Sequence, residues 1–543
     1  MKRKNTLWSL VLALVMVLGV FAPLSALAAQ PEEKVTNHVT IHKILLDKTA
    51  FAGFTEGTTG QDGTEYVGNQ IADVQKFFAT NGGTAKEIGG VYFVVKNEAG
   101  TKFINAEGKE TDNEAEALKG ETTADDGLKL DTSKLKGTFT IVEDQSKSKP
   151  VDKEGKALDG ELTGTKAVPV KITLPLVNKD GVVEEAHVYP KNTEEGPKID
   201  KNFDKDAEND AVKETELVGE VKNLDVTPGS TEAKPTLTRK VGDKVPFKVA
   251  TTIPKDAKYK VLTWSDTMDA GLVYNKDLKV KLGNAELTAN EYTIEQTDQG
   301  FTLTLNAEGL KKVSDAAVEA EQTITITYSA TIKGEIVPDT KLKNKVILTY
   351  GNNPEDKKTK EPTPPEVVTG GKKFVKTNDL GVKDEGFERL VGAEFYVKNK
   401  AGDKYLITTD DGYDWGEKTD AKVVVLTSGA DGVFEIKGLA YGNYKLEEKK
   451  PPEGYATRSG DVPLEVKEGS YDGLGDITYK KLANEGSAEY NQGTEALDAL
   501  QVRNKKVTIP QTGGMGTMIF MVAGLALMGG AFIAMRKRSA EQA

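Results

Sequence analysis

The chain has 543 residues, and its 84 Asp and Glu residues outnumber its 72 Lys and Arg residues, so that the net charge is −12. This acidic balance argues against nucleic acid and anionic membranes as partners. There is no cysteine and there are three histidines, which excludes disulfides and leaves few ligands for a metal. The sequence has no Gly-rich phosphate loop, no H-E-x-x-H and no G-x-S-x-G motif. We therefore expect no enzyme, no cofactor and no metal site.

Residues 1–28 have the pattern of a secretory signal peptide. A basic start precedes an apolar run from Leu7 to about Leu24, and the small residues of Ala26-Leu27-Ala28-Ala29 follow. The run is short for a membrane span and ends in an A-x-A site, which favours cleavage over a membrane anchor. We expect this segment to direct export and to be removed, with the scissile bond after Ala28 or Ala29.

The body of the chain has the pattern of a mainly β protein. Apolar and polar residues alternate over 39–43, 137–143, 322–328 and 433–437, and glycine and Asp/Asn turns separate such runs. Many short strands with frequent turns are typical of β-sandwiches. Helical patches interrupt them, and one is expected over 71–79.

Two linkers divide this body into three predicted domains. Polar residues over 190–197 form the first linker, and a proline-rich stretch over 357–371, which is expected to be semi-rigid, forms the second. The predicted domains are residues 30–192, 193–362 and 363–507.

Each predicted domain places a lysine, an acid and an asparagine on the apolar faces of its strands. Side chains alternate between the two faces of a strand, so that Lys376, for example, shares a face with Phe374. A lone buried charge is costly, but three converging groups can relieve the cost through chemistry. The trios are Lys43, Glu143 and Asn192 in the first domain, Lys201, Asp266 and Asn344 in the second, and Lys376, Glu448 and Asn504 in the third.

Two segments of the body resemble the pilins of Gram-positive bacteria. Residues 444–455, Y-K-L-E-E-K-K-P-P-E-G-Y, resemble the pilin E-box, Y-x-L-x-E-T-x-A-P-x-G-Y, with Lys449 and Pro451 in place of Thr and Ala. Residues 264–268, W-S-D-T-M, resemble the middle domain of backbone pilins, and for this reason Asp266 is taken as the acid of the second trio, which the sequence marks least clearly. The E-box implies a sandwich of the CNA-B kind, in which a lysine and an asparagine join as an isopeptide.

The chemistry of such a bond fits buried side chains. Burial lowers the pKa of a lysine and so yields a neutral, nucleophilic amine. Burial raises the pKa of a carboxyl group, so that a protonated acid can polarise the asparagine carbonyl and shuttle protons while ammonia leaves. The alternative is a salt bridge beside an amide, which the recurrence of the trio in three domains disfavours.

The segment H-V-Y-P-K-N over 187–192 resembles the pilin motif V-Y-P-K, with Tyr189, Pro190 and Lys191 as its last three residues. In that family, a pilin sortase joins this lysine to the C-terminal threonine of the next subunit. By strand alternation, Lys191 lies on the face opposite Asn192, so we expect Lys191 to point outward and Asn192 inward. The alternative is an ordinary exposed lysine at the end of a domain.

The C-terminal end has three parts in order: Ile509-Pro510-Gln511-Thr512-Gly513, an apolar stretch over 514–535 and a basic tail over 536–543. The apolar stretch is long enough to span a bilayer, and the cations hold its end on the cytoplasmic side. This order resembles the LPxTG sorting signal, with Ile509 in place of Leu. The resemblance implies that a sortase cysteine cuts between Thr512 and Gly513 and passes the Thr512 carbonyl to an amine. A plain membrane anchor is the alternative.

Nearly the whole chain resembles the three-domain major backbone pilins of sortase-assembled pili, of the SpaA-like type. The resemblance implies three tandem Ig-like or CNA-B-like β-sandwich domains in a shaft subunit that is secreted, polymerised through Lys191 and Thr512, and anchored covalently to the cell wall. The implied partners are other copies of the chain, a pilin sortase, a housekeeping sortase, minor pilins and peptidoglycan, with host matrix proteins as further candidates. The alternative is a monomeric wall-anchored adhesin that binds host matrix proteins.

Overall fold

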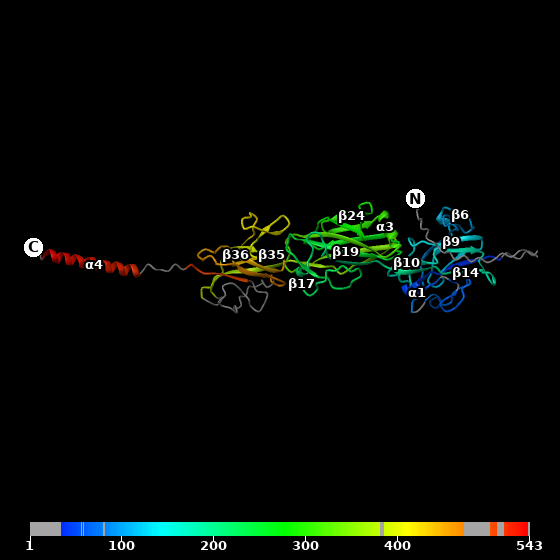
Figure 1. Ribbon diagram of the computed structural model, residues 1–543, viewed down its shortest axis with the longest axis horizontal. Helices are drawn as coiled ribbons and strands as arrows, with labels where there is room; N and C mark the ends of the chain where they lie inside the picture. Colours follow the sequence, from blue (N-terminus) through cyan, green and yellow to red (C-terminus); the bar gives the residue numbers. More distant parts are fainter. Residues whose placement is uncertain are drawn as a thin grey trace, which may run out of the picture. The chain divides into compact units, whose positions relative to one another are not determined.

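The computed structural model describes residues 34–55, 57, 59–79, 82–380, 385–471, 500–507 and 515–540 (Figure 1). The predicted signal peptide and the pentapeptide from Ile509 to Gly513 lie outside the described residues. The chain divides into two compact units, Met1–Gly334 with Lys341–Val368 and Glu335–Thr340 with Thr369–Ala543. The first unit holds most of the first two predicted domains, and the division into three domains stays a prediction.

The N-terminal part of the first unit consists of short strands that turn alternate apolar residues inward. Phe139 and Ile141 are buried in one strand, and Val39 and Ile41 are buried in another. The elements are β1 (His38–Ile41), β2 (Ile44–Leu46), α1 (Lys48–Gly53), α2 (Val74–Phe78), β3 (Ala85–Glu87), β4 (Tyr92–Asn97), β5 (Phe103–Ile104), β6 (Glu110–Thr111), η1 (Glu114–Glu116), β7 (Lys119–Glu121), β8 (Leu128–Asp131), β9 (Gly137–Glu143), β10 (Glu161–Lys166), β11 (Val170–Leu174), β12 (Val177–Asn178), β13 (Gly181–Val182), β14 (Glu185–Val188) and β15 (Lys191–Glu195).

Three sheets in this part carry the first trio and the predicted pilin motif. Their strand orders are β14–β1–β8, β10–β15–β2–β3 and β11–β9–β4–β5–β6. β15 runs parallel to β2 with Asn192 opposite Leu45, so the last strand of this part lies beside one of the first. The helix expected over 71–79 is the five-residue α2, because the Asp73 side chain accepts a hydrogen bond from the Lys76 N–H and caps it.

The rest of the first unit is a sandwich of two sheets, β16–β19–β26–β22–β23 and β17–β18–β29–β27–β20–β25–β24. The sheets face each other, since the Phe301 ring of one lies 5.0 Å from the Tyr328 ring of the other. The elements are β16 (Lys198–Phe203), η2 (Glu214–Glu216), β17 (Leu217–Val218), β18 (Thr236–Thr238), β19 (Lys244–Ile253), β20 (Val261–Met268), β21 (Leu272–Tyr274), β22 (Lys279–Leu282), β23 (Ala285–Glu286), β24 (Tyr292–Thr297), β25 (Gly300–Leu305), α3 (Ala307–Ala317), β26 (Gln322–Ile332), β27 (Leu342–Asn353), β28 (Asp356–Lys360) and β29 (Glu366–Val368).

The second unit also contains two facing sheets, β35–β30–β38 and β33–β32–β31–β36–β37. The rings of Phe374 and Phe395, one from each sheet, both stack on Phe434 at 4.8 Å. The first and last strands of the sandwich, β30 and β38, pair in parallel. The elements are β30 (Gly370–Asn378), β31 (Glu394–Lys398), β32 (Tyr405–Thr408), β33 (Tyr413–Gly416), β34 (Val425–Thr427), β35 (Val433–Leu439), β36 (Gly442–Lys450), β37 (Val462–Val466), β38 (Leu500–Asn504) and α4 (Met515–Ala540).

The C-terminal helix α4 contains a stretch, Phe520–Arg538, that is long and apolar enough to cross a membrane. Lys537 and Arg538 lie in its last turn, so these basic residues belong to the helix rather than to a separate tail. The mainly β fold of Ig-like sandwiches followed by an apolar C-terminal helix confirms the predicted fold class.

Both predicted linkers contain strands that pair with other segments of the first unit. β15 lies within 190–197 and pairs with β10. β28 pairs with β27, and β29 pairs in parallel with β18. The prolines of the second stretch fall between β28 and β29, where no ladder hydrogen bond is needed. A polar composition is typical of linkers, but it does not reveal whether the backbone pairs with a segment elsewhere in the sequence.

Candidate functional site

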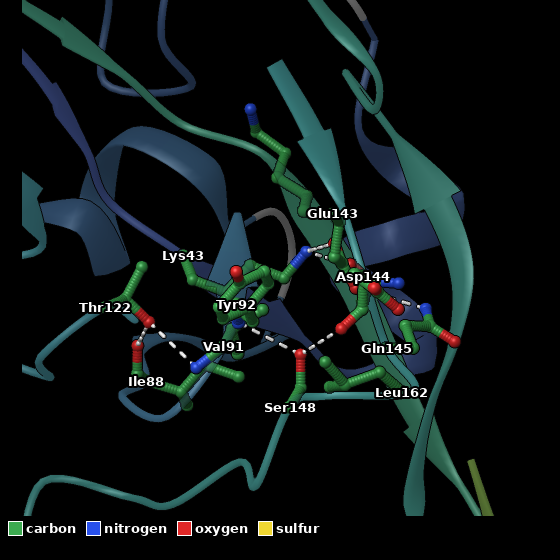
Figure 2. Close-up of polar contacts among 12 residues, drawn as sticks. Lys43, Ile88, Val91, Tyr92, Thr122, Glu143, Asp144, Gln145, Ser148 and Leu162 are labelled. Atoms are coloured by element: carbon green, nitrogen blue, oxygen red, sulfur yellow. Dashed lines mark hydrogen bonds and ion pairs between the residues drawn. The ribbon is translucent and has the colours of Figure 1, made fainter. Parts of the chain in front are cut away.

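The first trio lies where three strands of the N-terminal part meet. Lys43 stands between β1 and β2, Glu143 ends β9, and Asn192 is in β15. Lys43 Nζ donates hydrogen bonds to Glu143 Oε2 and to Asn192 Oδ1, and Figure 2 shows Lys43 directed at Glu143. The side chains of all three residues are buried. The structure therefore brings together the three residues that the sequence placed on inward faces.

The surroundings of the first trio lower the pKa of its amine and fix the orientation of its amide. Burial lowers the pKa of Lys43, and the negative charge of Glu143 opposes this shift. The Asn192 amide donates from Nδ2 to the Gly164 carbonyl over 2.9 Å, which leaves Oδ1 facing the amine. An amine, a carboxyl group and an amide carbonyl thus meet in a buried site.

The second trio bridges the two sheets of the middle sandwich. Lys201 lies in β16, in one sheet, and Asp266 and Asn344 lie in β20 and β27, in the other. Lys201 Nζ contacts Asp266 Oδ2 at 2.6 Å, and it also donates to the carbonyl of Lys345, the residue after Asn344, over 3.2 Å. Burial lowers the pKa of Lys201 to about 8, and burial raises the pKa of Asp266.

Tyr328 belongs to the second site, and the sequence analysis missed it. Its hydroxyl donates to Asp266 Oδ2 and accepts a hydrogen bond from Asn344 Nδ2 over 3.2 Å. Burial raises the pKa of Tyr328 well above its usual value, so the phenol stays protonated and links the acid to the amide. The sequence does contain a signal for Tyr328. In β26, alternation places it on the same inward face as Ile324 and Ile326, where a residue with a hydroxyl group stands out.

The third trio lies in the second unit, on β30, β36 and β38. Asn504 Nδ2 donates to Glu448 Oε2 over 2.9 Å, and Lys376 Nζ donates to the carbonyl of Val502, two residues before Asn504, over 3.0 Å. Burial lowers the pKa of Lys376 to about 7, although Glu448 opposes the shift. The backbone N–H of Arg458 also donates to Glu448 Oε2, over 2.7 Å, and thus helps to hold the acid.

Lys191 is buried, so the prediction that it points outward is wrong. Only 4% of Lys191 is exposed. Its Nζ donates to the Tyr189 carbonyl over 2.5 Å and lies 4.7 Å from the ring centre of Phe54 and 4.4 Å from that of Phe78. Lys191 does lie on the face opposite Asn192, but side chains from α2 and from the end of α1 cover that face.

The two residues before Lys191 are also held in place. The Tyr189 hydroxyl accepts a hydrogen bond from the Ile71 N–H over 2.6 Å, and its ring stacks on His42 at 4.9 Å. The Pro190 carbonyl accepts a hydrogen bond from the Ile44 N–H over 2.9 Å. The segment that the sequence identified as a pilin motif is therefore embedded in the N-terminal part.

Comparisons with family models cover most of the chain. The matches are "Gram-positive pilin subunit D1, N-terminal domain" at 34–193, "Gram-positive pilin backbone subunit 2, Cna-B-like domain" at 241–354, "Prealbumin-like fold domain" at 380–480 and "LPXTG cell wall anchor motif" at 501–539. Together with the sandwiches and the apolar C-terminal helix, they define a wall-anchored surface protein of Gram-positive type that is built from pilin domains.

Solved structures of pilus proteins are similar to this chain. The RrgB pilus protein of Streptococcus pneumoniae is 28% identical, matches with a TM-score of 0.66, and is aligned over 88% of this chain and 99% of that one. Another structure, of the full-length major pilin RrgB, gives 27% identity over 87% and 100% of the two chains with a TM-score of 0.48. The major pilin SpaD of Corynebacterium diphtheriae gives 20% identity over 87% and 98% with a TM-score of 0.40. No curated protein matches.

The chain belongs to the backbone pilins of Gram-positive bacteria. It is a shaft subunit of a pilus that sortase polymerises and that is anchored to the cell wall. The predicted family, function and location are thereby confirmed.

Proposed function

We propose that this backbone pilin strengthens each of its three β regions with an internal isopeptide bond between the lysine and the asparagine of each trio. The observation that carries the proposal is the contact of Lys43 Nζ with both Glu143 Oε2 and Asn192 Oδ1 in a buried site. In each reaction a bond forms between the lysine Nζ and the asparagine Cγ, the Cγ–Nδ2 bond breaks, and ammonia leaves. Atoms and charge balance without a cofactor.

The acid of each trio has two roles in this reaction. Protonated, it polarises the asparagine carbonyl, and it then carries a proton from the attacking amine to the departing nitrogen. In the second trio, the Tyr328 hydroxyl connects the acid to the amide, since it donates to Asp266 Oδ2 and accepts from Asn344 Nδ2. The acids Glu143, Asp266 and Glu448 act once, within their own chain, so we propose a structural protein rather than an enzyme.

We further propose that a pilin sortase joins Lys191 of one subunit to the Thr512 carbonyl of the next, and that a housekeeping sortase attaches the last subunit to peptidoglycan. Because Phe54 and Phe78 cover Lys191, its amine reaches an acyl donor only after the cover formed by these two rings has moved. The donor and acceptor sites differ, so the contact between subunits does not close on itself and yields a fibre. Minor pilins and host matrix proteins are the further proposed partners.

The rate of internal bond formation should depend on pH through the lysines. The pKa of Lys376 is about 7 and that of Lys201 about 8, and below its pKa the neutral fraction of an amine falls about tenfold per pH unit. We therefore expect the third trio to close at about half its maximal rate near pH 7, where half of the Lys376 amine is neutral. The second trio should slow about one pH unit higher than the third.

The measurement starts from chain recovered unfolded from inclusion bodies, which is refolded at a series of pH values and quenched in denaturant. The cross-linked peptide of each trio is then quantified by mass spectrometry. The two trios react in the same tube, so each controls for any effect of pH on folding as a whole. Equal rates at about pH 5 and about pH 8 for both trios would show that deprotonation of these amines does not limit the reaction.

A further inference from the structure

The acid of the first trio is held by a glutamine that is itself held from the middle sandwich. Gln145 Nε2 donates to Glu143 Oε1 over 3.1 Å, and Figure 2 shows Gln145 close to Glu143. Gln145 Oε1 accepts a hydrogen bond from Asn352 Nδ2 over 3.0 Å. Asn352 is 2% exposed and lies in β27, the strand that also carries Asn344 of the second trio.

Each neighbour in this series of hydrogen bonds fixes the orientation of the next amide. Asn352 Nδ2 also donates to the Leu162 carbonyl over 3.1 Å, and a carbonyl can only accept. Asn352 therefore presents its N–H groups to Gln145, and Gln145 turns its oxygen toward Asn352. The Gln145 N–H is then directed at Glu143 Oε1. The donors run in one direction, from the middle sandwich toward the acid of the first trio.

Other contacts within the first unit hold β27 at this place. The Tyr350 hydroxyl donates to the Asp159 carbonyl over 3.1 Å. Lys358 Nζ forms an ion pair at 2.8 Å with Glu161, whose side chain is buried. Asn352 reaches Gln145 because these contacts dock the middle sandwich on the N-terminal part.

We propose that Asn352 is a positioning residue for the bond between Lys43 and Asn192. This proposal rests on the isopeptide chemistry proposed above. Asn352 orients Gln145, and the Gln145 amide then donates to Glu143 Oε1. Glu143 Oε2 is left facing the lysine amine. The Lys43 Nζ–Asn192 Cγ bond forms as the Cγ–Nδ2 bond breaks, and Glu143 passes the proton to the departing ammonia. The first trio thus closes after β27 has docked, so that the N-terminal part is locked only in its assembled position.

The test is the rate at which the first trio closes during refolding of residues 30–507, the soluble body of the chain, followed through its cross-linked peptide. Asn352→Ala should slow this closure about tenfold, the effect of losing one positioning hydrogen bond. The second trio should close at the wild-type rate. Because Asn344 of that trio lies in β27, its closure also shows that β27 has folded. Asn353→Ala is the matched control, since Asn353 Nδ2 donates to the Ser148 carbonyl over 3.0 Å, and it should leave closure unchanged.

A second variant separates positioning from a merely structural role. Gln145→Ala should slow closure as much as Asn352→Ala, and combining the two should slow it no further, because both remove the same link. Additive slowing, or a wild-type rate in Asn352→Ala, would overturn the positioning role. A wild-type body that never forms the first bond would instead overturn the isopeptide proposal for this trio.

Discussion

Replacing Lys191 by arginine should abolish the ladder of covalent polymers while leaving single subunits attached to the cell wall. Arginine keeps the charge and can still lie against the rings of Phe54 and Phe78. Its guanidinium remains protonated at all working pH values and cannot attack the acyl-enzyme. Thr512→Ala should lose both the ladder and wall attachment, because it removes the threonine of the LPxTG-like motif that sortase must recognise before it can form the acyl-enzyme at residue 512. Denaturing gels of wall extracts and of the culture medium separate these outcomes.

Lys166→Arg is the matched control for this experiment. Lys166 lies opposite Lys191 in the β10–β15 pair, and its Nζ donates to the Phe51 and Phe54 carbonyls over 2.5 and 2.7 Å. It therefore occupies the same covered region but is not the proposed acceptor, and its substitution should leave the ladder intact. A normal ladder from Lys191→Arg would move the acceptor role to another lysine.

Glu448→Gln should prevent the third internal bond and lower the stability of the second unit. The bond would join Lys376 in the first strand of that sandwich to Asn504 in the last, and so close a long loop. By analogy with disulfides, such a cross-link is worth about 3–5 kcal/mol. Glutamine keeps the shape of the side chain, and its oxygen can still accept the hydrogen bonds from Asn504 and Arg458. The melting temperature and the trypsin sensitivity of the second unit report the loss.

The neighbouring substitution Glu447→Gln controls for the loss of a negative charge on the same strand. Glu447 forms ion pairs with Lys418 and with Lys398, a buried residue that also pairs with Asp461. The substitution should keep all three internal bonds, so any loss of stability that it causes measures these ion pairs alone. If Glu448→Gln melted and resisted trypsin like the wild type, the third bond would have no structural role.

The two-residue periodicity of strands made much of the site predictable. It placed Lys376, Glu448 and Asn504 on inward faces, and the structure has all three buried in the second unit. Tyr328 was missed because nothing in its own strand shows that Asp266 and Asn344 converge on it. The link from Asn352 through Gln145 to Glu143 depends on how β27 docks, which no local pattern encodes.

The surroundings of Lys191 show the limit of the same reasoning. Alternation correctly separated Lys191 from Asn192, but an outward face is exposed only if nothing packs on it. The segment with α1 and α2 covers that face, and Phe54 and Phe78 lie over the lysine. The strand β29 within the second predicted linker was not foreseen for a related reason, since it pairs with β18, which is distant in the sequence.

The intact mass of the denatured soluble body, residues 30–507, tests the internal bonds most directly. We expect a mass lower than the sequence mass by three molecules of ammonia, one for each trio. Glu143→Gln, Asp266→Asn and Glu448→Gln should each restore one ammonia, after allowance for the substitution itself. A wild-type body whose mass equals that of its sequence would contradict the account, because the buried trios would then be ion pairs beside amides and nothing more.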